Sequence, residues 1–98
     1  MIIELKKFGV TLTSRDDGRE AYLAVQPTLN NMDNEEVIEI DFMGVNTFTP
    51  SWGDEFITPL FKRFRDRLNL KNLNNPSVRR TLNTIENAND INLNKNFS

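Results

Sequence analysis

The sequence contains neither cysteine nor histidine. The absence of cysteine excludes a disulfide framework, a thiol nucleophile and a thiolate metal site. The absence of histidine excludes a Ser–His catalytic arrangement and an imidazole metal ligand. A metal-dependent enzyme would therefore need an all-oxygen site suited to magnesium or calcium. We expect no cofactor and no bound metal, and we expect the protein not to be an enzyme.

Long apolar segments are missing as well. The N-terminal stretch MIIELKK is far too short for a signal peptide or a membrane span. Hydrophobic residues make up 38% of the 98 residues, which is below the usual share for a globular domain. The length suits a single domain with a modest core. We therefore expect a cytoplasmic protein that has no membrane partner.

Charge is unevenly distributed along the chain. Residues 1–61 contain eleven acids and four bases, whereas residues 62–98 contain eight bases and three acids. The basic excess includes a cluster at Lys62–Arg67, which is either a nucleic-acid contact or the solvated face of a helix. The pI of about 5.1 argues against nucleic acid as the partner.

The first third of the chain predicts a strand followed by a helix. Residues 2–8 alternate weakly between apolar and charged side chains, which indicates a strand near a sheet edge. Ser14 begins the sequence SRDD, which suits a helix N-cap followed by acids in the first turn. Pro27 should kink or end this helix, because proline lacks the backbone N–H that a helix interior needs.

The middle of the chain carries the strongest patterns. Residues 37–42 are rich in β-branched and aromatic side chains, which predicts a buried central strand, and Gly44 marks the bend that follows it. A second helix is predicted from an apolar stripe of helical spacing, with Pro59 as an interior kink. The stripe consists of Trp52, Phe56, Leu60, Phe64 and Leu68, widened by Ile57 and Phe61.

The last third predicts a short strand in residues 69–74 and then a third helix. Asn75 and Pro76 form a suitable N-cap and first helical residue. The resulting β-α-β-α-β-α order predicts an α/β fold with a short, largely parallel sheet and helices mainly on one face. We assign residues 1–87 to this domain and residues 88–98 to an asparagine-rich tail, either disordered or ordered by a partner. An exposed edge at the first strand would also permit a homodimer.

Three stretches together resemble STAS-like domains, and more narrowly a STAS-like bacterial family of undefined function. They are TSRDDGRE in the first helix, IDFMGV on the central strand and SWGDEF at the second helix. The resemblance runs over residues 9–86. The wider group resembles anti-sigma-factor antagonists, in which a strand–loop–helix junction carries a serine that a partner kinase phosphorylates. The resemblance implies a non-catalytic regulatory domain whose partner is an ATPase-type serine kinase or an anti-sigma-like regulator.

The corresponding junction here is Asn46 to Gly53. Ser51 best matches the phosphorylated serine, and Thr49 is the second candidate. The junction reads Thr-Pro-Ser-Trp-Gly, whereas antagonists usually have an Asp-Ser-Ser/Thr-Gly type of sequence. On sequence alone Ser51 is either a phosphorylation site or only the N-cap of the second helix, with Asp54 at capping-box distance.

Seven residues form the predicted partner-binding set. They are Arg15, Arg19, Asp41, Ser51, Trp52, Asp54 and Glu55. The two arginines are four residues apart and can grip a phosphate or a carboxylate, or simply pair with neighbouring acids. Trp52 is either part of the core or, if exposed, an anchor for a partner.

Carboxylates in this set have structural alternatives. Asp41 stands at the end of the central strand, where it can accept hydrogen bonds from loop N–H groups. Asp54 and Glu55 are adjacent helical residues that point about 100° apart, so they do not naturally converge on one atom. Complementing the helix dipole in the first turn is their expected role. The alternative functions are a small carboxylate-dependent enzyme and nucleic-acid binding through Lys62–Arg67.

Overall fold

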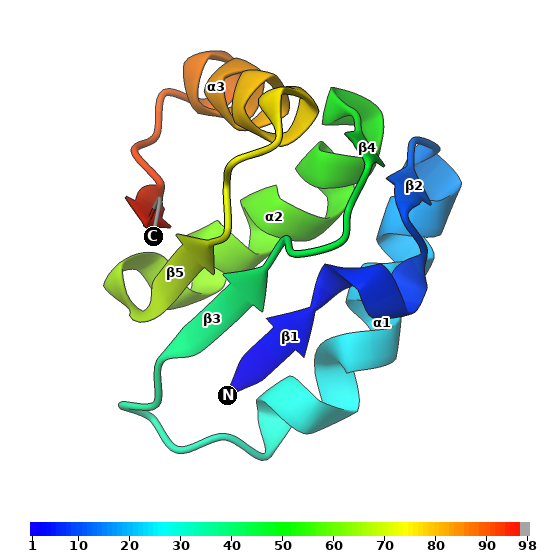
Figure 1. The fold of residues 1–98 in the computed structure, drawn as a ribbon. Coiled ribbons are helices and arrows are strands. Elements are labelled where there is room, and N and C mark those ends of the chain that lie inside the picture. Colours follow the sequence, from blue (N-terminus) through cyan, green and yellow to red (C-terminus); the bar gives the residue numbers. More distant parts are fainter. Residues whose placement is uncertain (97–98) are drawn as a thin grey trace.

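The computed structural model describes residues 1–96 and has an α/β fold (Figure 1). A four-stranded parallel sheet has the order β1 (Ile2–Glu4), β3 (Ile38–Asp41), β5 (Leu68–Lys71), β6 (Asn94–Asn96). A second, two-stranded parallel sheet pairs β2 (Thr11–Leu12) with β4 (Thr47–Phe48). The helices are α1 (Arg15–Asn30), α2 (Pro50–Phe64) and α3 (Pro76–Asn89), and two 3-10 turns are η1 (Leu5–Phe8) and η2 (Arg65–Arg67).

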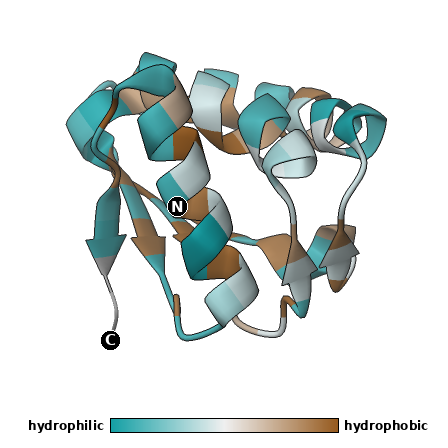
Figure 2. Ribbon diagram, turned by 90° about the horizontal axis from the view of Figure 1, so that it is seen from above, coloured by the Kyte–Doolittle hydropathy of each residue, from teal (hydrophilic) through white to brown (hydrophobic). Residues whose placement is uncertain are grey.

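Figure 2 shows the helices lying mainly on one side of the strands, with the start of α3 reaching past them. The alternation of side chains in β3 and β5 explains this arrangement. Ile38 and Ile40 are fully buried, and in register with them Leu68 and Leu70 are fully buried too. The intervening residues are polar and only half-buried, so the opposite face can meet water. The predicted α/β fold with a largely parallel sheet and helices mainly on one face is confirmed.

The apolar face of α2 forms the centre of the core. α2 packs against both α1 and α3, and its stripe from Trp52 to Phe64 is buried. Five aromatic rings continue this core around the start of α2, with neighbouring centroids 5.0 to 6.2 Å apart. The rings belong to Phe8, Phe42, Phe48, Trp52 and Phe56. The start of α2 is therefore fixed by the core.

Two glycines allow the helices to approach closely. A Cβ on Gly18 of α1 would lie 2.5 Å from the carbonyl oxygen of Trp52. A Cβ on Gly53 would lie 2.7 Å from the end of Ile85 in α3 and 2.9 Å from the Phe48 ring. Glycine, whose side chain is a single hydrogen atom, is therefore required at both positions for α2 to pack this closely against α1 and α3.

Several boundaries differ from the sequence predictions. The first strand ends at Glu4 and η1 follows, so it is shorter than residues 2–8. Pro27 does not end α1, which continues to Asn30. Pro27 has no N–H to donate to the backbone carbonyl of Leu23, one turn earlier. Because Leu23 is 59% exposed, water can bond that carbonyl instead. Leu68 is not the end of the apolar stripe of α2 but the first residue of β5.

The end of the chain adds an unpredicted strand. α3 continues to Asn89, and after a short connection β6 pairs in parallel with β5. Residues 97 and 98 of the proposed tail lie outside the described part. The division of the chain between residues 87 and 88 stays a prediction, as does dimerisation at the edge of β1.

Candidate partner-binding site

The junction between β4 and α2 begins with Thr49, which is the N-cap of α2. The Thr49 Oγ1 accepts a hydrogen bond from the backbone N–H of Trp52 at 3.5 Å and donates one to the Thr13 carbonyl at 2.8 Å. The prediction that Ser51 caps this helix is wrong. Pro50 supplies the reason, because proline has a preset φ and no N–H and is favoured at the first helical position. Ser51 is therefore the second residue of the helix.

Contacts from α3 hold the junction in place. The backbone N–H of Phe48 donates to the Ser77 Oγ at 3.1 Å, and the Thr81 hydroxyl donates to the Phe48 carbonyl. The Asn75 side-chain amide donates to the carbonyls of residues 45 and 46 at 3.2 and 3.0 Å. The sequence identified Asn75 as a helix cap but gave no sign of these long-range contacts. Sequence reasoning missed Ser77 and Thr81 entirely.

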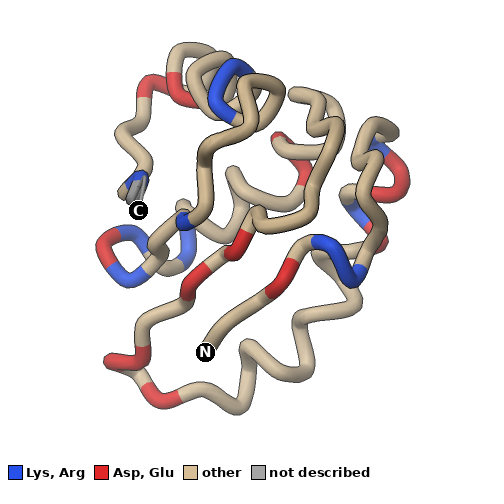
Figure 3. The backbone as a smooth tube through the Cα atoms, in the orientation of Figure 1, with Lys and Arg blue, Asp and Glu red and all other residues tan. Residues whose placement is uncertain are grey.

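Four of the predicted partner-binding residues come together where α1 and α2 run side by side. The Arg15 guanidinium lies 3.2 Å from the Glu55 Oε1 and 3.9 Å from the Asp54 Oδ2. Arg19 lies 3.6 Å from the same Glu55 oxygen and 3.5 Å from Asp16. We call Arg15, Arg19, Asp54 and Glu55 the α1–α2 ion cluster. Figure 3 shows basic and acidic segments close together at the start of α1.

The ion cluster lies at the surface. Both arginine side chains are more than half exposed, and the Asp54 side chain is 42% exposed. Asp54 is also tied to its surroundings by hydrogen bonds from the hydroxyl of Thr58 at 2.7 Å and the amide of Asn89 at 3.2 Å. Since α2 begins at Pro50, Asp54 and Glu55 lie beyond its first turn. The prediction that Asp54 and Glu55 complement the helix dipole in the first turn of α2 is therefore wrong. The two carboxylates pair with the arginines of α1 instead.

Ser51 and Trp52 lie beside this cluster but differ in exposure. Ser51 is half-buried, and Asp54 and Glu55 follow it at the three- and four-residue spacing that shares a helix face. Trp52 is only 1% exposed, so its side chain belongs to the core. Its backbone supplies the close contact with Gly18. Trp52 is therefore part of the core and not an exposed anchor for a partner.

Asp41 lies apart from the junction, at the end of β3. Its Oδ1 accepts hydrogen bonds from the Met43 backbone N–H at 2.9 Å and the Asn72 amide at 2.6 Å. Partial burial acts to raise the pKa of Asp41, but these hydrogen bonds and the charges of Lys71 and Lys6 lower it below its ordinary value. On the same sheet face, a hydrogen bond and the charge of Glu39 raise the pKa of Lys71. Asp41 thus ties the turn after β3 to the end of β5.

The basic cluster at Lys62–Arg67 contacts the first half of the chain. Arg63 donates to the side chains of Gln26 at 3.1 Å and Asn30 at 2.9 Å, both on α1. Arg67 donates to two carbonyls in the loop before β3, each at 3.4 Å. Both guanidinium groups also lie about 5 Å from the centroid of the Phe64 ring. These contacts give the two arginines a structural role.

Within residues 1–96, no group of three or more acidic side chains could hold a metal ion. The helices of this part of the chain are all too short or too polar to cross a membrane.

Comparison with known proteins identifies the family. No curated protein and no solved structure matches the chain. A family model described as a STAS-like domain of unknown function (DUF4325) matches residues 25–78. The matched part runs from the second half of α1 to the first turn of α3, and it contains β3, the β4–α2 junction and β5. The protein therefore belongs to this family of STAS-like domains.

Proposed function

We propose that this STAS-like domain is a non-catalytic regulatory module that binds a protein partner through the α1–α2 ion cluster and Ser51. The observation that carries the proposal is the exposed ion cluster one turn beyond Ser51, where Arg15 holds Glu55 at 3.2 Å. Charged groups that are exposed and fixed by mutual contacts suit recognition of a complementary surface. The rigid junction beneath them limits the conformational entropy lost on binding.

Phosphorylation of Ser51 is the proposed switch. A phosphate would add about 1.5 to 2 negative charges beside Asp54 and Glu55. It would repel these carboxylates and compete with them for the Arg15 guanidinium, which pairs bidentately with phosphate. Arg15 would move from Glu55 toward Ser51, so the charge pattern that a partner meets would change while the core stayed intact. Thr49 suits this role less well, because its hydroxyl already bonds Thr13 and caps α2.

The proposed partner is an ATPase-type serine kinase or an anti-sigma-like regulator. Membership of the STAS-like family supports this choice. Arg19 and Arg15 offer guanidinium donors, and Glu55 offers an acceptor, so a partner surface with both signs of charge would fit. Two members of the predicted set are left out of this surface: Asp41, because its hydrogen bonds serve the end of the sheet, and Trp52, because its side chain is buried in the core.

A charge-swap experiment tests the binding surface. Tagged wild-type protein and the double variant Arg15→Glu/Glu55→Arg are purified from native cells, and the associated proteins are quantified by mass spectrometry. The double variant keeps opposite charges at positions 15 and 55 and reverses the charges that a partner would meet there, while Arg19 and Asp54 keep their charges. We expect it to lose an associated ATPase or regulator that wild type retains. The matched control Glu35→Arg, in the exposed loop before β3, should keep that partner.

Equal recovery of the same proteins by wild type and the double variant would place the interface elsewhere and refute the proposed site. The switch is tested separately with the recovered partner and ATP. We expect a phosphate on Ser51, absent in Ser51→Ala, and weaker binding of Ser51→Asp. Retained binding by Ser51→Asp together with an unmodified Ser51 would refute the switch and leave the binding surface in place.

A further inference from the structure

A groove runs along the free edge of β1. Within residues 1–96, β1 is the first strand of the four-stranded sheet and pairs only with β3. Figure 1 shows α1 running past its other edge. The groove between them has a volume of about 190 Å³ and is lined by Met1 and β1, by Lys7 and Phe8 of η1, and by Val25 and Thr28 of α1. We call it the β1 edge groove.

The backbone of β1 has hydrogen-bonding groups that face this edge. The Met1 carbonyl accepts a hydrogen bond from the Glu39 N–H at 2.8 Å, so the backbone groups of Met1 and Ile3 face β3. Because these groups alternate in direction along a strand, the N–H and C=O of Ile2 face away from β3. The Ile2 side chain is 59% exposed, and Met1, Ile3 and Phe8 are half-buried. A strand added here would remove apolar surface from water on both faces of the sheet.

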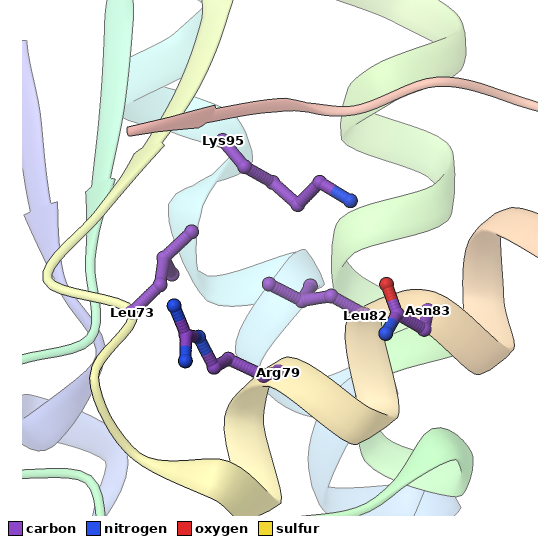
Figure 4. A pocket seen from close by; sticks show the side chains of 5 residues that line it. All are labelled: Leu73, Arg79, Leu82, Asn83 and Lys95. Atoms are coloured by element: carbon purple, nitrogen blue, oxygen red, sulfur yellow. The ribbon is translucent and has the colours of Figure 1, made fainter. Parts of the chain in front are cut away.

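The opposite edge strand, β6, has a different character. It consists of Asn94, Lys95 and Asn96. Figure 4 shows Lys95 on the side of β6 that faces α3, where it pairs with Glu86. Short, polar edge strands that contain lysine are a usual means of avoiding strand addition. The apolar edge of the sheet is therefore β1.

The end of β1 that leads into η1 is basic. Lys6 pairs with Glu4 at 3.5 Å. The Lys7 ammonium lies at the β1 edge groove and forms no ion pair within residues 1–96. Two bases and one acid leave this end with one net positive charge.

The other end of β1 is acidic. The loop before β3 contains Asp33, Glu35 and Glu36. The Met1 ammonium pairs with Glu36 at 3.2 Å, and Arg67 donates to two backbone carbonyls of the loop. Three carboxylates and two cations leave this end with one net negative charge. Figure 3 shows these basic and acidic segments at opposite ends of β1.

We propose that the β1 edge is a dimer interface, at which β1 of a second copy of this chain pairs in antiparallel orientation. A twofold axis at Ile2 lets the two Ile2 residues exchange both of their backbone hydrogen bonds. A register centred on Ile3 would need the Glu4 carbonyl, which serves the start of η1. The two four-stranded sheets would join into one sheet of eight strands. The interface shares no residue with the α1–α2 ion cluster, so it does not depend on the proposed function.

This register brings opposite charges together. Ile2 is in register with Glu39 of β3. Lys7 follows Ile2 by five positions, and Asn34 precedes Glu39 by five positions. Lys7 of one copy is therefore level with the acidic loop of the other, and the symmetry produces this contact twice. Parallel pairing would instead place the two Lys7 residues beside each other, so the charges select the antiparallel arrangement.

Sedimentation velocity of the full chain, from about 5 µM to about 1 mM, measures the association. We expect a reversible dimer with a Kd on the order of 100 µM. Because exposed ion pairs are screened by salt, raising NaCl from about 0.05 M to about 0.5 M should weaken it severalfold. A monomer at every concentration in low salt would overturn the proposal.

A pair of charge reversals tests the arrangement. Lys7→Glu and Asp33→Lys should each raise the Kd of the dimer about tenfold, because each places like charges together at two symmetric contacts. An equimolar mixture of the two variants should associate within about twofold of wild type, since the mixed dimer restores opposite charges at both contacts. Arg80→Glu, an exposed position on α3, is the control and should dimerise as wild type does. Failure of the mixture to recover association would refute the interface.

Ile2→Pro tests the backbone pairing. Proline removes an N–H that faces the free edge, so the pairing of β1 with β3 is kept. We expect an unchanged circular dichroism spectrum and at least a tenfold rise in the Kd of the dimer. Wild-type association by folded Ile2→Pro would refute strand pairing. If this variant fails to fold, the charge-reversal mixture still decides the proposal.

Discussion

Replacement of Gly18 by alanine tests whether the close crossing of α1 and α2 determines stability. By helix propensity alone, alanine inside α1 should stabilise the protein by about 1 kcal/mol. The added Cβ would, however, lie 2.5 Å from the Trp52 carbonyl oxygen and 3.0 Å from its Cα. Ordinary contacts begin at 3.4 Å, so the two helix backbones would have to separate by roughly 0.9 Å.

Such separation affects the best-packed part of the core. Overpacking of a core usually costs about 1–3 kcal/mol, and here the obstacle is backbone, which cannot change rotamer. We therefore expect a cost in the upper part of that range, about 2–3 kcal/mol. After the propensity gain of about 1 kcal/mol, Gly18→Ala should lower the free energy of unfolding by about 1–2 kcal/mol. For a domain of this size, that corresponds to a fall in Tm of roughly 4–16 °C.

Urea unfolding followed by circular dichroism and tryptophan fluorescence measures this change, because Trp52 is the single tryptophan and is buried. Leu23→Ala, at a position 59% exposed on the same helix, is the control and should stay within about 0.5 kcal/mol of wild type. An unchanged or raised midpoint for Gly18→Ala would refute the reasoning, because propensity would then outweigh the contact with Trp52.

Two further predictions concern the helix cap and the sheet. Thr49→Ala should lower the free energy of unfolding by about 1–2 kcal/mol, since the N-cap bond and the bond to Thr13 are both lost. Ser51→Ala should change it by less than about 0.5 kcal/mol. If urea unfolding showed a larger loss of stability for Ser51→Ala than for Thr49→Ala, Ser51 would be the cap. Asp41 has a lowered pKa in the folded protein, so its contribution to stability is present above its unfolded pKa and is lost as the pH falls through the folded value. Asp41→Asn should therefore lose less stability than wild type between pH 6 and pH 3, and parallel loss in the two proteins would contradict the role given to the Asn72 and Met43 hydrogen bonds.

The central elements were predictable because their local patterns agree with their tertiary environment. In β3, β-branched residues alternate with acids, and the buried and half-buried faces follow that alternation. In α1, the Ser14 hydroxyl accepts the Asp17 N–H at 3.0 Å, as the capping sequence predicts. In both cases local and global preferences coincide.

The unpredicted strands have little local signal. β6 consists of Asn94, Lys95 and Asn96, residue types that are depleted in strands, and its conformation comes from pairing with β5. β4 contains only Thr47 and Phe48, and it depends on pairing with β2 and on hydrogen bonds from α3. Tertiary contacts that no window of sequence contains determine both strands.

The sequence named candidate residues for the site but did not predict how they are arranged in space. Arg15 and Glu55 are separated by 40 positions, and nothing in either local sequence indicates that they meet. The error at Ser51 had a visible signal, since Pro50 suits the first position of a helix and so moves the cap back to Thr49. The exposure of the arginines and the burial of Trp52 could be distinguished only once the packing of α2 was known.

The close crossing of α1 and α2 connects the core to the proposed binding surface. Gly18 contacts the backbone of Trp52; Arg15 lies one turn before Gly18, and Glu55 lies one turn after Trp52. The separation at which glycine allows the helices to cross therefore sets the distance between the arginines and carboxylates above it. A side chain at position 18 that pushed the helices apart would lengthen the Arg15–Glu55 pair as well as loosen the core. For this reason Gly18→Ala should weaken partner binding even under conditions in which the domain remains fully folded, whereas Thr49→Ala should act mainly through stability.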